Sequence, residues 1–292
     1  MTHKAGFVNI IGSPNVGKST LMNALVGEKI SIITSKAQTT RHRIMGIVNG
    51  DDFQIVYSDT PGIMEPNYKL QASMMKFVTN SLKDADIILF VSEIKGDSIN
   101  DEFIQILNDS NIPKILVINK IDLSNQKELE EKVEYWHSKI PKAVILPVSA
   151  LKKFNVDVVF NRILEALPEN PPYFPKDELT DKSTRFFISE IVREKILLNY
   201  QKEIPYSVEV VVDEYKESKD IIRIYTTIFV TRESQKMILL GHKGKAIKQL
   251  GIDARKDIEE FVDNHVYLEL TVKVNKDWRN NENQLKRFGY EL

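Results

Sequence analysis

Residues 10–25 read IIGSPNVGKSTLMNAL and decide the fold of the first half of the chain. The stretch starts with apolar, strand-forming residues, passes through two glycines and ends in a helix-like pattern. Residues 12–19 match G-x-x-x-x-G-K-[ST], in which backbone N–H groups cradle a phosphate chain. Lys18 can reach the terminal phosphates, and the hydroxyl of Ser19 is placed to bind Mg²⁺. The alternative, a glycine turn with an incidental Lys-Ser pair, is disfavoured by the strand before it and the helix after it.

Up to residue 168, short apolar runs alternate with helix-like segments. The runs ADIILFVSE, KILVINK and KAVILPVSA are typical of parallel strands buried on both faces. GIVNGDDFQIVYSDT contains two strand patterns that meet at Asn-Gly-Asp, a strong hairpin signal. This rhythm predicts an α/β P-loop domain with a mainly parallel sheet over residues 1–168.

A proline-rich stretch, residues 169–182, breaks the rhythm and predicts an extended, stiff linker. Beyond it, residues 183–292 show helix, strand, strand, helix, helix and strand patterns, followed by a terminal helix. We therefore predict a separate α+β domain of the order α-β-β-α-α-β.

Composition excludes some classes of protein. The 292 residues carry a formal net charge of −1, so gross charge does not indicate a nucleic-acid binder and such a role needs a local basic patch. Cysteine is absent, which excludes disulfides and thiolate metal sites and favours a reducing cytosol. The N-terminus lacks a signal-peptide pattern, and no apolar run approaches the roughly 20 residues of a membrane span.

The base-recognition signal is N-K-x-D at residues 119–122. Asp122 would accept both the N1–H and the exocyclic amine of guanine, whereas adenine has no matching donors. Lys120 would lay its alkyl stem along the base, and the backbone N–H of Ala150, in Ser149-Ala150-Leu151, would contact the guanine O6. Alone, N-K-x-D is as consistent with a solvated loop, but downstream of the phosphate loop it indicates a guanine nucleotide.

Two further segments complete the nucleotide site. Asp59, in D-T-P-G, can bind Mg²⁺ through water, and Gly62 can offer its N–H to the γ-phosphate. The alternative is an ordinary turn. The loop KAQTTRHRIMG supplies Thr39 and Thr40 as candidates to cover the γ-phosphate, and we favour Thr40 as the Mg²⁺ ligand.

A G-x-x-G loop, GHKG at residues 241–244, lies between two helix patterns. Such a loop can approach a phosphodiester backbone and clamp about four nucleotides. Basic residues gather around it: Lys236, Lys243, Lys245, Lys248, Arg255 and Lys256. A tight helix–helix turn with solvated lysines is the alternative. The α-β-β-α-α-β order together with the basic cluster favours RNA.

With these motifs in order, the chain resembles the Era family of bacterial ribosome-assembly GTPases. The stretches KAQTTRHRI, PPYFP, SEIVREKI, RESQKMILLGHKGKAIKQLGIDARKDIE, VYLELTVKVNKDW and LKRFGY carry the resemblance over essentially the whole length. The resemblance implies a type II KH domain, small-subunit (16S) ribosomal RNA bound near its 3′ end, and a role in 30S assembly. It also implies peripheral association of some members with the inner membrane. For this chain we expect a monomer in the cytoplasm.

The expected site residues fall into four sets. For GTP or GDP they are Gly12, Ser13, Pro14, Asn15, Val16, Gly17, Lys18, Ser19, Thr20, Asp59, Thr60, Pro61, Gly62, Ile63, Asn119, Lys120, Asp122, Ser149 and Ala150. For the switch segment they are Gln38, Thr39, Thr40, Arg41 and His42. For Mg²⁺ they are Ser19, Thr40 and Asp59. For RNA they are Gly241, His242, Lys243, Gly244, Lys245 and Lys248.

The catalytic step is the least specified. Ras-type GTPases carry a water-orienting glutamine where this chain has Ile63, which cannot hydrogen-bond water. Asn15 matches a residue that binds K⁺ in related GTPases; the alternative is a loop-closing side chain. We therefore expect slow unassisted turnover.

Two alternative functions remain. One is a GTPase whose C-terminal domain binds a protein or membrane, and the other is a P-loop kinase, against which N-K-x-D argues.

Overall fold

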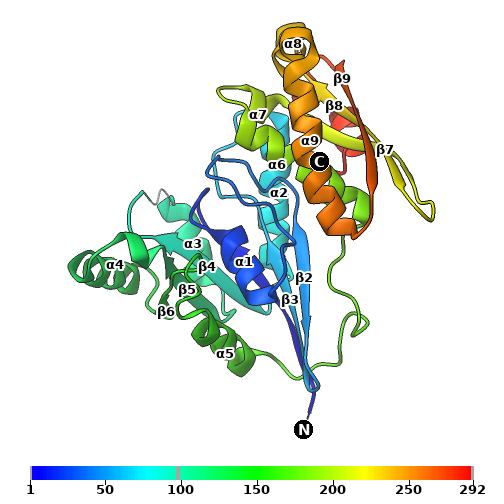
Figure 1. Ribbon diagram of the computed structural model, residues 1–292. Coiled ribbons are helices and arrows are strands. Elements are labelled where there is room, and N and C mark those ends of the chain that lie inside the picture. Colours follow the sequence, from blue (N-terminus) through cyan, green and yellow to red (C-terminus); the bar gives the residue numbers. More distant parts are fainter. Residues whose placement is uncertain (1, 97–98, 291–292) are drawn as a thin grey trace. The chain divides into compact units, whose positions relative to one another are not determined.

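The computed structural model describes residues 2–96 and 99–290 and contains two compact units (Figure 1). The first comprises the chain up to Pro66 together with Met74–Asp181. The second comprises Asn67–Ser73 and the chain from Lys182 onward.

A six-stranded sheet forms the centre of the first unit, in the order β2-β3-β1-β4-β5-β6. Its strands are β1 (Lys4–Ile11), β2 (Ile44–Asn49), β3 (Phe53–Asp59), β4 (Ile87–Glu93), β5 (Lys114–Asn119) and β6 (Val144–Pro147). All neighbours are parallel except β2, which forms the predicted hairpin with β3. The parallel strands β4 and β5 are buried almost throughout, as their continuous apolar runs predict. The predicted mainly parallel P-loop fold is confirmed.

Helices cover both faces of this sheet. They are α1 (Lys18–Val26), α2 (Lys69–Lys83), α3 (Asp101–Asp109), α4 (Gln126–Lys139) and α5 (Val156–Ala166), with a 3₁₀ turn η1 at Ile121–Leu123. One apolar cluster joins α2, α3 and α4 to β1, β4 and β5, and Trp136 lies fully buried in it. Helix α1 packs on β1 and β3 and against α5. Because β1, β3, β4, β5 and β6 run in the same direction, the loops that follow them meet at one edge.

The proline-rich segment is bonded to the outer edge of this sheet. The side-chain oxygen of Gln54, a fully buried residue on β3, accepts from Tyr173 N at 2.7 Å and from Phe174 N at 3.0 Å. Farther along, Ile47 N on β2 donates to Leu179 O at 2.8 Å, and Asp181 Oδ1 accepts from Met45 N at 2.9 Å. The extended course of this segment therefore depends on pairing with the hairpin as well as on proline.

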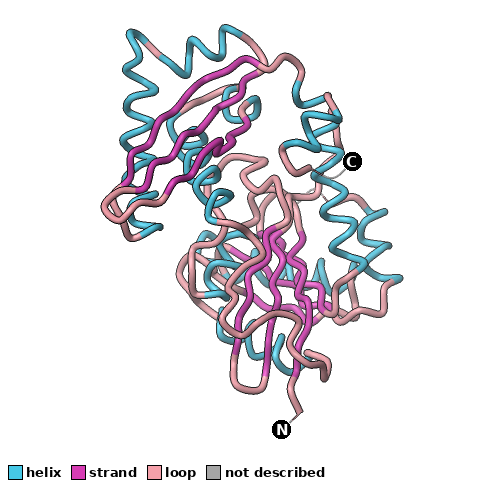
Figure 2. Tube along the Cα trace, turned by 90° about the vertical axis from the view of Figure 1, so that its right-hand side faces the viewer, coloured by secondary structure: helices cyan, strands magenta, loops and turns pink. Residues whose placement is uncertain are grey.

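The second unit has a three-stranded sheet of order β7-β8-β9 (Figure 2). Its elements are α6 (Thr184–Asn199), α7 (Ile204–Ser207), β7 (Glu209–Lys216), β8 (Ile222–Val230), α8 (Glu233–Leu240), η2 (His242–Gly244), α9 (Lys245–Val262), β9 (Val266–Val274), η3 (Trp278–Asn280) and α10 (Glu282–Arg287). Strands β7 and β8 are antiparallel, and β8 and β9 are parallel. This is the predicted α-β-β-α-α-β order.

Two local details differ from the sequence prediction. The short helix α7 is absent from the predicted order, and β7 begins after it at Glu209. Pro205 sits in the first turn of α7, where its fixed φ is favourable. The predicted terminal helix corresponds to α10, which a separate 3₁₀ turn at Trp278–Asn280 precedes.

Candidate nucleotide-binding site

The phosphate loop joins β1 to α1 and has no room for side chains at its two glycines. Gly12 has φ 148°, and a Cβ there would lie 2.1 Å from the carbonyl oxygen of Val91. Gly17 has φ 96°, a left-handed conformation that L side chains rarely adopt. The loop shape therefore requires both glycines and leads directly into the N-terminus of α1, a favourable place for anions.

Lys18 lies within this loop. Its side-chain nitrogen donates to the carbonyls of Gly12 at 3.1 Å and Ser13 at 2.8 Å, and the residue is only 6% exposed. The ammonium is thus held inside the curve of the loop, where the phosphates of a nucleotide would lie.

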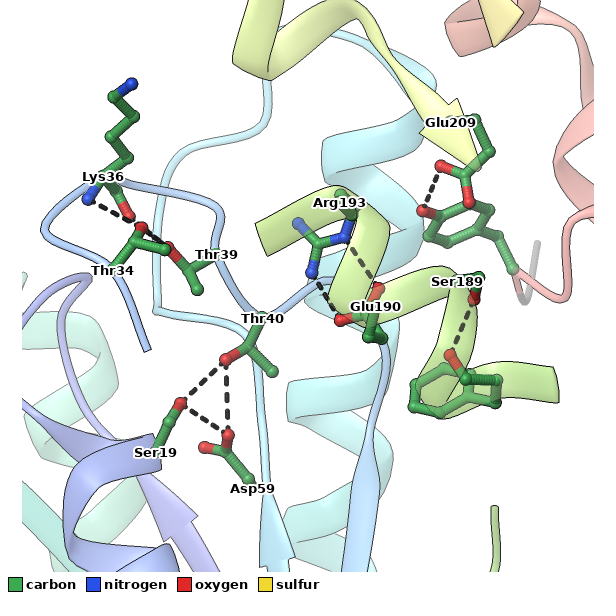
Figure 3. Close-up of polar contacts among 12 residues, drawn as sticks. Ser19, Thr34, Lys36, Thr39, Thr40, Asp59, Ser189, Glu190, Arg193 and Glu209 are labelled. Carbon is green, nitrogen blue, oxygen red and sulfur yellow. Dashed lines mark hydrogen bonds and ion pairs between the residues drawn. The ribbon is translucent and has the colours of Figure 1, made fainter. Parts of the chain in front are cut away.

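Three expected metal ligands converge beside the loop (Figure 3). Ser19 Oγ donates to Asp59 Oδ2 at 2.7 Å and lies 2.9 Å from Thr40 Oγ1. Thr40 Oγ1 in turn lies 3.3 Å from the same oxygen of Asp59. These residues come from α1, the end of β3 and the switch segment, so only the fold brings them together.

Asp59 fits a hard cation. Burial raises its pKa, and the hydrogen bond from Ser19 and the charge of Lys18 offset part of that rise. Its Oδ1 is buried and has no hydrogen-bond partner among the described residues, so a metal-bound water would supply one. Oxygen donors of this kind suit Mg²⁺. Across residues 2–96 and 99–290, no group of three His, Cys, Asp or Glu side chains offers a different metal site.

The neighbours of Thr40 in the switch segment point elsewhere. Thr39 Oγ1 donates to Lys36 O at 2.6 Å and lies 2.6 Å from Thr34 Oγ1, so it closes its own loop (Figure 3). Arg41 is 1% exposed, and the ring of His42 packs 5.9 Å from that of Phe77. Of the two threonines, only Thr40 faces the metal ligands.

The base-recognition loop is bonded to the phosphate loop. Asn119 Nδ2 donates to Val16 O at 2.9 Å, and Asn119 Oδ1 accepts from Ala150 N at 3.0 Å. Lys120, which has φ 61°, donates to Asn15 O at 2.6 Å and pairs with Glu93 at 2.5 Å. Asn119 therefore connects the ends of β1, β5 and β6.

Asp122 stands on the exposed rim of the cleft. Ser149 Oγ donates to its Oδ1 at 2.5 Å, which fixes one carboxylate oxygen. The N–H of Ala150 is bonded to Asn119, so its contact with a guanine O6 stays a prediction that requires sharing that donor. Serine in the S-A-L tripeptide thus positions the aspartate.

These residues surround a cleft of about 470 Å³. Expected residues that line it are Pro14, Asn15, Gly17, Lys18, Ser19, Thr20, Gln38, Thr39, Thr40, Gly62, Asn119, Lys120 and Asp122. Val16, Asp59, Thr60 and Ala150 lie behind the lining and are buried. Thr60 Oγ1 bonds the carbonyl of Ile10 at 2.7 Å, which indicates support of the loop rather than ligand contact.

The sequence reasoning missed several lining residues. Ile32, Ile33, Thr34 and Ser35, from the loop after α1, line one side of the cleft, and Leu123 and Leu151 line the base side. Both leucines are more than 70% exposed, which is unusual for leucine. Leu123 directly follows N-K-x-D and Leu151 is the last residue of S-A-L, which was a usable signal, whereas the two isoleucines look like ordinary core residues.

The G-x-x-G loop forms a tight turn between α8 and α9. Gly241, Lys243 and Gly244 all have positive φ, at 69°, 50° and 75°. The exposed side chains of the expected RNA set are His242, Lys243, Lys245 and Lys248. A Cβ on Gly244 would meet nothing within 4 Å, so the backbone there is open to a ligand.

Comparison with known proteins places the chain in a family. A family model described as 50S ribosome-binding GTPase matches residues 7–120, and a KH domain model matches residues 203–279. GTPase Era of Staphylococcus epidermidis is 46% identical over 291 residues, which cover 99% of this chain and 97% of that relative. The chain belongs to the Era family of GTPases.

Solved Era structures share the whole architecture. Two of them have a TM-score of 0.94 and 42% identity, and the match covers 99% of this chain and 100% of theirs. One is Era in complex with MgGDPNP and nucleotides 1506–1542 of 16S ribosomal RNA; the other is a variant of Aquifex aeolicus Era bound to GDP and AlF₄⁻. The resemblance to Era drawn from the motifs is confirmed.

In this Era-family chain, the residue after D-T-P-G does not face the cleft. The backbone N–H of Ile63 donates to Gly12 O at 3.0 Å, and its side chain packs against the apolar cluster under α2 and α3. Ile63 therefore braces the phosphate loop and offers nothing to an attacking water. Among the described residues no helix has both the length and the apolar character of a membrane span.

Proposed function

We propose that the protein binds GTP with Mg²⁺, hydrolyses it to GDP and phosphate, and binds small-subunit ribosomal RNA near its 3′ end during assembly of the 30S subunit. One observation carries the nucleotide half: Ser19, Thr40 and Asp59 converge at one end of a cleft whose other end holds Asp122. The RNA half is supported by the KH match and by the Era complex with 16S nucleotides.

Each group in the site has a separate task. Residues 12–17 hold the phosphates through backbone N–H groups, and Lys18 neutralises their charge. Ser19 and Thr40 would bind Mg²⁺ directly and Asp59 through water; the ion would neutralise charge that develops on the phosphate oxygens. Asn119 braces the loops, and Lys120 and Asp122 select guanine. Because Thr40 lies in a loop and not in a helix or strand, loss of the γ-phosphate would release residues 38–42.

Turnover should be slow without a partner, on the order of 10⁻⁴ s⁻¹ or somewhat above. Ile63 supplies no hydrogen bond to water, so water positioning must come from loop backbone, a partner or a cation. Asn15 is the candidate K⁺ ligand: its side-chain nitrogen donates to Ser35 O at 3.1 Å, which points its amide at the loop after α1. Faster hydrolysis in KCl than in NaCl, lost in Asn15→Ala, is the expected result. Equal rates in both salts would exclude this role.

The RNA contact is assigned to the loop at residues 241–244 and to Lys245 and Lys248. Two variants at Gly244 separate the effect of a negative charge from that of an added side chain, because Asp and Asn have similar size and both tolerate left-handed φ. Gly244→Asp should weaken binding of a 16S 3′-end fragment at least about tenfold, and Gly244→Asn much less. Unchanged binding in Gly244→Asp would favour the rival reading, a C-terminal module for a protein or membrane partner.

The same proposal includes the organisation of the molecule. Residues 1–168 would be the GTPase domain, 169–182 the linker and 183–292 the KH domain with its C-terminal helix. We propose a cytoplasmic monomer that associates peripherally with the inner face of the cell membrane. Light scattering and fractionation of cell extracts in each nucleotide state would test these two points.

A further inference from the structure

Arg43, the last residue before β2, makes a planar set of hydrogen bonds. Its Nη1 lies 2.5 Å from Asp84 Oδ2 and its Nη2 lies 3.1 Å from Asp84 Oδ1, a two-pronged ion pair. Its Nε donates to Ser58 Oγ at 2.6 Å. All three guanidinium nitrogens are therefore engaged, and the side chain is 13% exposed.

A buried asparagine completes the cluster. Asn9, on β1, accepts from Arg43 Nη2 at 3.3 Å and donates to Asp84 Oδ1 at 2.8 Å and to the carbonyl of Ser81. Asn9 and Ser58 are fully buried. The cluster thus joins β1, β3, the start of β2 and the end of α2 at a single guanidinium.

Chain geometry gives this cluster a consequence for the metal site. Thr40 lies three residues before Arg43, so its Cα can be at most roughly 11 Å from that of Arg43. Ser58 directly precedes Asp59, so the guanidinium also binds the residue next to the metal-site carboxylate. A fixed Arg43 thereby limits where Thr40 can lie relative to Asp59.

We propose that Arg43 is a positioning residue that ends the movable part of the switch segment and holds Thr40 within reach of Mg²⁺ and the γ-phosphate. The inference rests on the proposed role of Thr40. It gives the switch segment expected at residues 38–42 a fixed end, because the structure anchors Arg43 to the sheet. Lysine could not replace it, since an ammonium lacks the planar fork.

The test compares affinities for GDP and for the GTP analogue GDPNP, both with Mg²⁺. Arg43→Gln should weaken GDPNP binding about tenfold and leave GDP binding within about twofold, because GDP does not engage Thr40. Arg43→Lys should behave like Arg43→Gln. Arg162→Gln is the matched control: it breaks an exposed pair with Glu165 on α5 and should change neither affinity.

Asp84→Asn provides an independent variant if Arg43→Gln is poorly folded, since Asp84 is about half exposed and asparagine keeps its shape. It should lower the preference for GDPNP over GDP to a similar extent. The double variant, with both Arg43→Gln and Asp84→Asn, should lose no more of this preference than either single variant. An unchanged preference in folded Asp84→Asn or Arg43→Gln overturns the proposal.

Thr40→Ala tests the underlying assignment separately. If Thr40→Ala loses the preference for GDPNP and the Arg43 and Asp84 variants keep it, the anchor is wrong and the proposed function stands. If the Arg43 variants lose the preference while Thr40→Ala keeps it, the proposal is overturned, because Arg43 then does not act through Thr40.

Discussion

A Cβ atom on Gly17 would lie 2.3 Å from the side-chain nitrogen of Asn119. That nitrogen donates to the carbonyl of Val16 at 2.9 Å, so the phosphate loop and the base-recognition loop meet without space for one methyl group. The two motifs are far apart in sequence, yet the loop after β1 packs against the residue that ends β5. The two loops therefore brace each other.

Gly17→Ala should abolish measurable nucleotide binding, because alanine strains a φ of 96° and collides with Asn119. Gly27→Ala is the matched control: φ is 88°, but a Cβ there meets nothing within 4 Å. The control should lose about 1 kcal/mol of unfolding free energy and keep its affinity. Calorimetry with GDP and thermal melting measure the two quantities. Equal binding by both variants would show that the contact with Asn119 is unimportant.

Asp122→Asn should switch the base. An asparagine no longer accepts two hydrogen bonds from guanine, so GDP affinity should fall at least about tenfold. Its amide can instead donate to the carbonyl that xanthine carries in place of the guanine amine. The variant should therefore bind xanthosine diphosphate more tightly than the parent protein does. Asp157→Asn, an exposed position on α5, is the charge-matched control. Competition binding with both nucleotides measures the base preference. An unaltered preference contradicts the assignment of Asp122 to guanine.

Asp59→Asn should separate stability from metal binding. Burial raises the pKa of Asp59, so its ionised form at neutral pH destabilises the folded protein when no cation is present. In EDTA without nucleotide, the variant should melt at a higher temperature than the parent. With Mg²⁺ and GDPNP, the parent should melt at the higher temperature, since only the parent has the carboxylate that binds the ion. A variant less stable in EDTA would exclude this account.

The second unit contains a buried ion pair that should matter for its stability (Figure 3). Arg193 and Glu190 are bonded at 2.7 and 2.5 Å, and both are less than 10% exposed. Glu190→Gln should cost about 1.5–3 kcal/mol of unfolding free energy, because it removes the charged acceptor of two hydrogen bonds from a buried guanidinium. Glu165→Gln, which breaks the exposed pair with Arg162 at the same spacing, should cost less than about 1 kcal/mol. Urea denaturation followed by fluorescence measures both.

Gln54→Ala should release the segment that follows Pro168. The alanine removes the acceptor for two backbone N–H groups, Tyr173 and Phe174, as well as a donor to Phe174 O. Limited proteolysis should then cut within residues 169–181 sooner than in the parent. Gln126→Ala, which removes a side-chain bond on the exposed surface of α4, should leave the cleavage rate unchanged. Equal resistance would mean that the bonds to Gln54 are not needed to hold the segment in place.

Local sequence was sufficient for the elements that carry the chemistry. Gly12, Gly17 and Lys18 could be assigned from spacing, because a loop of this length between a strand and a helix has few conformations that suit a phosphate chain. The G-x-x-G turn and the hairpin at Asn49-Gly50 follow for the same reason, since φ and turn geometry are properties of a few adjacent residues. The order of the strands and helices followed from hydrophobic periodicity.

Tertiary structure alone decided which side chains meet. It brought Thr40 rather than Thr39 to Asp59, aimed Ser149 at Asp122, turned Ile63 into the core and tied the segment after Pro168 to β2. It also placed Arg43 against Asp84 and Asn9, a cluster with no motif in the sequence. A conformation of neighbouring residues can be inferred from the residues themselves. A contact between distant ones depends on strand order, register and side-chain direction, and these arise only when the whole sheet packs.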